Sequence, residues 1–257
     1  MCRHLGHVGP RPVTLASRVT EPEHSLLVQS YAPADMRGGG TVNADGFGVG
    51  WYSGSGDAGA LTAHSYRQPV PMWTDGSFLD LATAVTATAF VAAVRSATVG
   101  MPVSTGACAP FRDGTRIFSH NGVVRGWPDS LADLAADLPT ETLMTLEAPT
   151  DSAVLWALVR RHLDAGKDPA DAVADVASRV LAAAPGSRLN LLLLTRDPAT
   201  GHPTLAATAV DHALSYRCGD DGVTVASEPL DPDPAWTAVD DLRLVVVRDG
   251  TVEVEPL

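Results

Sequence analysis

The chain has 257 residues, of which 45% are hydrophobic and 19% are charged, and its formal net charge is −12 at pH 7. This composition is typical of a soluble globular protein with a substantial core. The acidic balance and the lack of any Lys/Arg cluster argue against nucleic acid or an anionic membrane surface as a partner. No apolar stretch approaches the roughly 18 to 20 residues of a membrane span, and no apolar segment of a signal peptide is found, so we expect a cytoplasmic protein.

The early part of the chain alternates predicted strands with a short helix. A strand is expected around His4 to Val8, a helix over Ser25 to Tyr31, and a strand within Asn43 to Tyr52, where glycines alternate with large apolar residues. Glycine inside a strand is typical of a bulge or of close approach by another backbone or a ligand. The apolar segment from Ala87 to Ala97 predicts a buried strand, in which Arg95 is the only charge.

A further strand is predicted over Arg116 to Ser119, and it runs into the sequence His-Asn-Gly. As an isolated dipeptide, Asn121-Gly122 is typical of a hairpin turn. Both the turn and a role in a functional site are open on this evidence.

Helices are predicted in the middle of the chain and hairpins at its end. A short helix is expected over Asp129 to Ala136, another opens at Asp151, and a third runs from an Asp168-Pro169 start to Pro185. The remaining strands are expected over residues 189–195, 203–210, 214–217, 223–227, 242–248 and 251–254. Strands, then grouped helices, then hairpins predict an α+β fold with antiparallel sheet. Without a repeat or a linker, residues 1–257 are expected to form a single domain.

The cysteines and histidines give no metal-binding pattern. Cys2, Cys108 and Cys218 are an odd, widely separated set, which favours reduced thiols over disulfides. His4 and His7 are the only close histidine pair, and a third ligand is not evident nearby. We therefore expect neither a metal nor another cofactor.

Cys2 stands directly behind the initiator methionine. Removal of Met1 would place a thiol and a free α-amine on one residue, and the amine, with an ordinary pKa of about 7.7 to 8.0, is a base suited to activating the thiol at neutral pH. The alternative is a small buried cysteine with no chemical role. A retained Met1 would block the amine.

Six short motifs occur in a fixed order along the chain. They are Cys2, NADGFGVGW from residue 43, VRSAT from residue 94, APF from residue 109, SHNG from residue 119 and Asp-Ser at residue 151. Together they resemble the class II glutamine amidotransferases of the N-terminal-nucleophile hydrolase type, over essentially the whole chain. Three further phrases, LLVQSYAP, AAVRSATVGMP and VASEPLDPDPAW, are similar to the stand-alone members that act in ergothioneine biosynthesis.

The resemblance implies a four-layer α/β/β/α sandwich of two antiparallel sheets. It implies that Cys2 attacks a γ-glutamyl amide to form a thioester, and that the Asn121 side-chain amide and the Gly122 N–H stabilise the oxyanion. The residues that it implies for substrate binding are Arg95, Thr98, His120 and Asp151.

Three of these binding residues have an implied role, and two of the three also have an alternative. Arg95 would bind the α-carboxylate of the glutamyl group. Asp151 would accept from its α-ammonium, or serve only as a helix N-cap. Thr98 would add a hydroxyl contact, or serve only in strand packing. The chain departs from the family at Ala93, where the common run begins with histidine, and at Cys108, which either lies near the site or is a buried small residue.

The implied function is hydrolysis of γ-glutamyl-hercynylcysteine sulfoxide to glutamate and hercynylcysteine sulfoxide. Its trimethylammonium group would suit the aromatic faces of Trp51, Trp73 or Tyr31. One alternative is a glutaminase that supplies ammonia to a separate synthase, and another is an inactive γ-glutamyl-binding module. The substrate class is a small γ-glutamyl molecule, and the sequence leaves the oligomeric state open.

Overall fold

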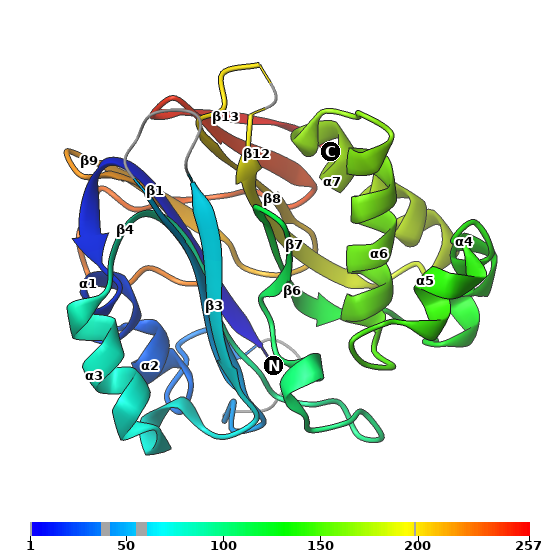
Figure 1. The fold of residues 1–257 in the computed structure, drawn as a ribbon, viewed down its shortest axis with the longest axis horizontal. Coiled ribbons are helices and arrows are strands. Elements are labelled where there is room, and N and C mark those ends of the chain that lie inside the picture. The colour runs from blue at the N-terminus through cyan, green and yellow to red at the C-terminus, as the bar shows by residue number, and fades with distance from the viewer. Residues whose placement is uncertain (1, 37–41, 55–60, 198) are drawn as a thin grey trace.

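The structure is a computed structural model, and it describes residues 2–36, 42–54, 61–197 and 199–257. Two β-sheets lie face to face, and each carries helices on its outer side (Figure 1). Every strand pair in the described residues is antiparallel, as the sequence predicted. Met1, whose removal is expected, lies outside the described residues.

The first sheet has the strand order β11-β9-β10-β1-β4-β2-β3. Its strands are β1 (Arg3–Thr14), β2 (Phe47–Ser53), β3 (Thr62–Gln68), β4 (Thr86–Val94), β9 (Ser215–Gly219), β10 (Gly222–Ala226) and β11 (Thr237–Ala238). The second sheet has the order β13-β12-β8-β7-β6-β5. Its strands are β5 (Phe111–Asp113), β6 (Arg116–Val123), β7 (Arg188–Arg196), β8 (Pro203–Ala209), β12 (Arg243–Arg248) and β13 (Thr251–Pro256).

The helices form the outer layers. They are α1 (Ala16–Val19), α2 (Leu26–Gln29), α3 (Gly76–Ala84), α4 (Ala132–Ala136), α5 (Thr140–Met144), α6 (Asp151–Asp164) and α7 (Pro169–Ala183), with short 3₁₀ helices at Met72–Thr74, Thr105–Ala107 and Asp129–Leu131. The first three helices contact the sheet that contains β1, and α6 and α7 contact the sheet that contains β7 (Figure 1). The four-layer prediction is therefore confirmed. No helix in the described ranges has the length and apolar character to cross a membrane.

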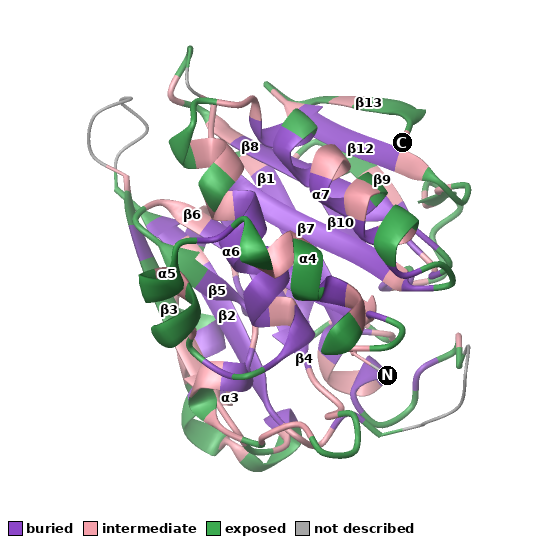
Figure 2. Cartoon of the chain, turned by 90° about the vertical axis from the view of Figure 1, so that its right-hand side faces the viewer, coloured by how far each residue is buried: buried purple, intermediate pink, exposed green. Residues whose placement is uncertain are grey.

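Strand β7 shows how the sequence builds the layers. Successive side chains of a strand point to opposite faces, so Leu191 and Leu193 join the cluster under α6 and α7, whereas Leu192 and Leu194 join the cluster between the sheets. The strand is buried on both faces (Figure 2), which explains its uninterrupted run of leucines. Each such leucine contributes about 1.5 to 3 kcal/mol of burial free energy.

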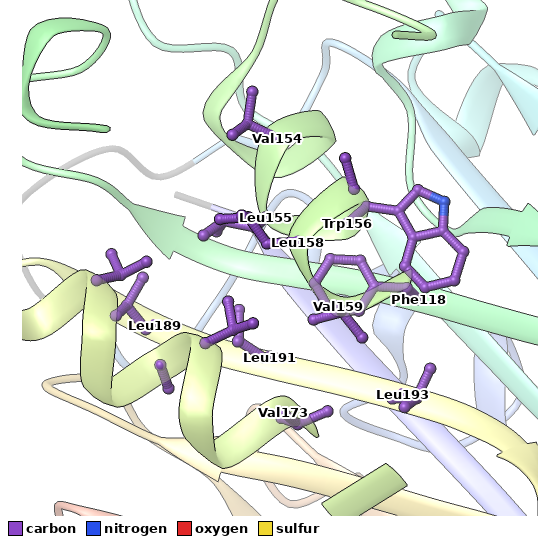
Figure 3. Close-up of a cluster of buried hydrophobic side chains, with 14 of the residues drawn as sticks. Phe118, Val154, Leu155, Trp156, Leu158, Val159, Val173, Leu189, Leu191 and Leu193 are labelled. Atoms are coloured by element: carbon purple, nitrogen blue, oxygen red, sulfur yellow. The ribbon is translucent and has the colours of Figure 1, made fainter. Parts of the chain in front are cut away.

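Helix α6 is fixed over the second sheet by an aromatic contact and by its cap. The rings of Phe118 and Trp156 stack with centroids 5.3 Å apart (Figure 3). At its N-terminus the Thr150 hydroxyl accepts from the Ala153 N–H at 3.2 Å. This cap and this contact place the first turn of α6 beside the end of β6.

The structure excludes one local alternative and corrects one predicted boundary, and both matter for the site. Asn121-Gly122 does not form a turn but lies inside β6, where these residues pair with Asn190 and Leu189 of β7. The predicted strand over residues 87–97 ends at Val94, so Arg95 begins the loop that follows it. In the first case the long-range pairing with β7 overrides the local preference of Asn-Gly for a turn.

Candidate active site

A cavity lies where β1 begins, and residues distant in the sequence line it together. Six of the seven sequence-predicted site residues lie on its wall: Cys2, Arg95, Thr98, His120, Gly122 and Asp151. An adjoining hollow is also lined by Cys2, Arg95, His120 and Ser152, and it extends toward Phe111. The seventh residue, Asn121, is not on the wall but is fully buried between His120 and Gly122.

Cys2 is half-buried and immediately precedes β1. Its Sγ lies 3.7 Å from the Ser96 carbonyl oxygen, and its own carbonyl accepts from Nη1 of Arg3 at 2.9 Å. The buried Arg3 is in turn paired with Glu228, at 2.5 Å from Nε to Oε1. Burial opposes ionisation of Glu228, but its hydrogen bond with His24 and the charge of Arg3 lower its pKa to about 2. A buried ion pair therefore anchors the backbone beside the thiol.

His120 faces the cavity with both ring nitrogens already bonded. Nε2 lies 3.1 Å from the Arg188 carbonyl, and Nδ1 lies 2.9 Å from Oγ of Ser152. Because a carbonyl can only accept, Nε2 donates to Arg188, and the Ser152 hydroxyl lies between Nδ1 of His120 and Oδ1 of Asp151, which is 3.3 Å away. His120 thus fixes the rotamer of Ser152 and shapes the wall, with no ring nitrogen left over for a ligand.

Gly122 lies where β6 runs very close to β7. A Cβ atom at this position would stand 1.9 Å from the Arg188 carbonyl oxygen, which belongs to the backbone and cannot move aside alone. Only glycine fits here.

Asn121 points to the other face of β6, toward β1 and β10. Its Nδ2 donates to Oγ of Ser227 at 2.9 Å, and no residue that the structure describes bonds to its Oδ1. Ser227 also contacts the backbone of His4, two residues beyond the thiol. Asn121 is therefore linked to the start of β1 through a single side chain.

Arg95 follows β4 directly and is half-buried. Nη1 donates to the Pro102 carbonyl at 2.8 Å, which leaves its other guanidinium N–H groups without a partner among the described residues. The loop behind it is held by Asp45, whose carboxylate accepts from the Ala97 N–H at 2.7 Å. A planar group with free donors on a cavity wall is suited to bind a carboxylate.

Asp151 is buried at the first turn of α6, but it is not the N-cap, so that alternative was wrong. Thr150 caps the helix, whereas the Asp151 carboxylate accepts from the Val124 N–H at 3.0 Å and from the Ser152 N–H at 2.7 Å. No Lys or Arg in the described parts of the chain pairs with it. A buried carboxylate without a cation on a cavity wall is suited to bind an ammonium group.

The structure also places Thr98, Cys108 and the three aromatic residues that the sequence analysis named. Thr98 is exposed in the loop after β4, so its strand-packing alternative was wrong. Cys108 is buried, with Sγ 3.3 Å from the Ser104 carbonyl, and burial raises the pKa of its thiol, as for a structural cysteine. Trp51 stacks on His64 and packs against the cluster under α1 to α3, away from the cavity. Tyr31 and Trp73 meet edge to face on the surface, and their role in cation binding stays a prediction.

Two hydroxyl residues of this region were not predicted. Both belong to motifs that the sequence analysis quoted without assigning them a role: Ser152 to the Asp-Ser motif, and Ser227 to the phrase VASEPLDPDPAW. In the described residues, no group of three or more His, Cys, Asp or Glu side chains is arranged to hold a metal ion.

Comparison with known proteins places these features in a family. A "Gamma-glutamyl-hercynylcysteine sulfoxide hydrolase" of Mycolicibacterium smegmatis is 40% identical over 258 residues, covering 100% of both chains. The protein of that name from Mycobacterium tuberculosis is 39% identical, covering 100% of this chain and 97% of its own. No family model matches the chain.

A solved structure supports the fold. The glutamine aminotransferase class-II domain protein of Silicibacter pomeroyi superposes with a TM-score of 0.66 at 23% identity, covering 99% of both chains.

Proposed function

The chain belongs to the class II glutamine amidotransferases, and we propose that it hydrolyses the γ-glutamyl amide bond of γ-glutamyl-hercynylcysteine sulfoxide to glutamate and hercynylcysteine sulfoxide. The observation that carries this proposal is the full-length 40% identity to a protein of that activity. The cavity supports it, because a thiol, a free guanidinium and an unpaired carboxylate meet there. These are the groups that a γ-glutamyl amide requires.

The nucleophile in this proposal is the Cys2 thiol, after removal of Met1. The α-amine of Cys2, directly or through a water, takes the thiol proton, and the thiolate attacks the γ-carbonyl carbon. The carbonyl double bond opens to an oxyanion. Collapse of this tetrahedral intermediate breaks the C–N bond, and the protonated α-amine of Cys2 passes its proton to the departing nitrogen. A γ-glutamyl thioester on Cys2 remains.

The oxyanion is stabilised in this proposal by the Asn121 side-chain amide and the Gly122 backbone N–H. Both belong to β6, which pairs along its length with β7 and is therefore rigid. Donors fixed before the reaction need no reorganisation in the transition state, and loss of one typically costs about 10²- to 10³-fold in kcat.

The glutamyl end is held by opposite charges. The free donors of Arg95 bind the α-carboxylate, and the buried carboxylate of Asp151 accepts from the α-ammonium. Thr98, on the same wall, adds a hydroxyl contact, and His120 supports the wall through Ser152. These contacts hold the γ-carbonyl next to the Cys2 thiol, so that attack by the thiolate becomes a unimolecular step within the complex.

Hydrolysis of the thioester completes the cycle. A water gives its proton to the free α-amine and adds to the thioester carbonyl, and the same donors stabilise the second oxyanion. Cys2 leaves as a thiolate and is reprotonated, which releases glutamate. We further propose that residues 1–257 act as one domain, because both sheets share one buried interface, and that the enzyme works in the cytoplasm, where its thiol stays reduced.

A substrate comparison tests the proposal. Purified enzyme is incubated with synthetic γ-glutamyl-hercynylcysteine sulfoxide, with γ-glutamylcysteine and with glutamine, and released glutamate is measured. We expect the highest kcat/KM for the first. Rapid turnover of glutamine, with none of the sulfoxide conjugate, would contradict the proposal and favour an ammonia-supplying glutaminase.

A further inference from the structure

We propose that Ser227 is the positioning residue of the oxyanion site: its hydroxyl selects which edge of the Asn121 amide points toward the reacting carbonyl. This inference rests on the proposed function. It concerns a residue that is not on the wall of the cavity, and it comes from the hydrogen bonds around one buried oxygen atom.

Ser227 lies at the junction of three strands. It follows the last residue of β10, and only 1% of its surface is exposed. Its N–H donates to the His4 carbonyl at 2.9 Å, and its Oγ accepts from the His4 N–H at 3.0 Å. Its Oγ also lies 2.9 Å from Nδ2 of Asn121 in β6. One side chain therefore joins the strand of the nucleophile to the strand of the oxyanion donors.

The hydroxyl proton decides the orientation of the amide. Ser227 has one O–H proton, and this proton is directed to the His4 carbonyl at 3.1 Å. Its oxygen can then only accept from Asn121, which requires the NH₂ edge of the amide on that side. At present Ser227 Oγ makes three hydrogen bonds: it accepts from the His4 N–H and from Asn121, and it donates to the His4 carbonyl. If the Asn121 amide were flipped, Oδ1 would face Ser227, and the hydroxyl proton would have to turn from the His4 carbonyl to Oδ1. Ser227 Oγ would then make only two hydrogen bonds.

Nothing else in the described residues holds the Asn121 amide. It is fully buried, and its Oδ1 has no hydrogen-bond partner there. Nδ2 has two protons, of which Ser227 receives one. The second has no bonding partner in the described residues, and the proposed function assigns it to the oxyanion. Without Ser227 the two amide orientations differ little in hydrogen bonding, and the inverted one would present an oxygen lone pair to a negative charge.

Kinetics of four variants test this. We expect Ser227→Ala to lower kcat about tenfold with KM within about twofold of wild type, since one hydrogen bond fixes the amide. Asn121→Ala should lower kcat about 10²- to 10³-fold. The double variant should equal Asn121→Ala, because Ser227 acts only through the amide. A double variant about tenfold below Asn121→Ala would overturn the inference, as would a Ser227→Ala kcat within twofold of wild type.

Ser119→Ala is the matched control. Ser119 is equally buried and lies in the same strand as Asn121. Its hydroxyl also bonds His4, at Nδ1 and 3.1 Å, but it makes no hydrogen bond to the Asn121 amide. We expect its kcat within about twofold of wild type, and thermal unfolding of all variants reports any loss of stability. If the kcat of Ser119→Ala fell as far as that of Ser227→Ala, loss of any hydroxyl near His4 would be enough to lower kcat, and the inference would be overturned.

A second measurement does not depend on turnover. In ¹⁵N–¹H spectra the side-chain amide signal of Asn121 is assigned by its loss in Asn121→Ala. We expect that signal to shift and its protons to exchange faster in Ser227→Ala, but not in Ser119→Ala. An unchanged signal would overturn the inference. A wild-type protein that releases no glutamate would contradict the proposed function instead, and these spectra would still decide the role of Ser227.

Discussion

Replacement of Asp151 by Asn should abolish recognition of the substrate α-ammonium while leaving the fold in place. Asp151 is 7% exposed, its carboxylate accepts from two backbone N–H groups and from the Ser152 hydroxyl, and it pairs with no Lys or Arg side chain in the described residues. A hydrogen bond between charged groups at such a site contributes about 1.5 to 3 kcal/mol, which corresponds to roughly 10- to 150-fold in kcat/KM.

The assay compares two substrates that differ only at this group. One is the γ-glutamyl conjugate and the other is its glutaryl analogue, which lacks the α-ammonium. We expect wild-type enzyme to prefer the glutamyl form by roughly 10- to 150-fold, and Asp151→Asn to show a ratio near one. Asn can accept only one of the two N–H bonds through its single oxygen, so stability should also fall by about 1 to 3 kcal/mol.

Asp168→Asn is the control for this prediction. Asp168 is also a carboxylate at a helix start, and it caps α7 by accepting from the Ala170 N–H at 2.8 Å. Asn caps a helix as well as Asp does, so the replacement mainly removes the partly exposed ion pair of Asp168 with Arg248. It should lower stability by at most about 1 kcal/mol, with no change in the substrate ratio. An Asp151→Asn enzyme that keeps the wild-type preference would refute the assignment of the ammonium to Asp151.

Three further predictions concern the nucleophile, the oxyanion strand and pH. Cys2→Ala should abolish glutamate release, and calorimetry should still detect substrate binding. Glutamate release at the wild-type rate in this variant would exclude Cys2 as the nucleophile. Gly122→Ala should lower kcat at least about 10²-fold, because the clash with β7 requires a shift of more than 1 Å, and should lower the melting temperature, whereas Gly76→Ala, with no atom within 4 Å of the added Cβ, should do neither. Burial lowers the pKa of His4 to about 3 and that of His7 to about 4, from 6.5. Between these folded-state pKa values and 6.5, the unfolded chain binds more protons than the folded chain. The free energy of unfolding should therefore rise with pH from about 4 to 6.5, by up to about 1.4 kcal/mol per pH unit for each histidine. Equal stability toward urea at pH 5 and pH 7 would contradict this.

The α+β class and most of the helices and strands followed from local patterns, whereas the four layers were implied only by the family resemblance, and the strand order was not predicted. The apolar runs of β4 and β7 and the capped start of α7 were visible in the sequence, because burial on both faces and N-caps leave local signals. Strand β3 was missed because it is a polar strand at the sheet edge, and β5 because it has only three residues. The neighbours of each strand depend on pairings between distant segments, which periodicity does not record.

The candidate site could likewise be predicted from the sequence only in part. The proposed nucleophile and the proposed charged binding residues were predicted from the position of Cys2 and from short motifs, since the proposed chemistry needs particular residue types. Ser227 was not found, because its role depends on contact with Asn121, 106 residues away in the chain. The N-cap alternative for Asp151 was ruled out only by its place in the first turn of α6, after the cap Thr150, and the strand-packing alternative for Thr98 only by its place in the loop after β4.

Acid-quenched mass spectrometry of the enzyme during turnover tests the central claim most directly. We expect the working protein to lack Met1 and a fraction of it to carry one glutamyl group on Cys2, which fragmentation would locate. A fully active preparation that retains Met1, or that never carries this adduct under rapid quenching, would contradict an N-terminal cysteine nucleophile.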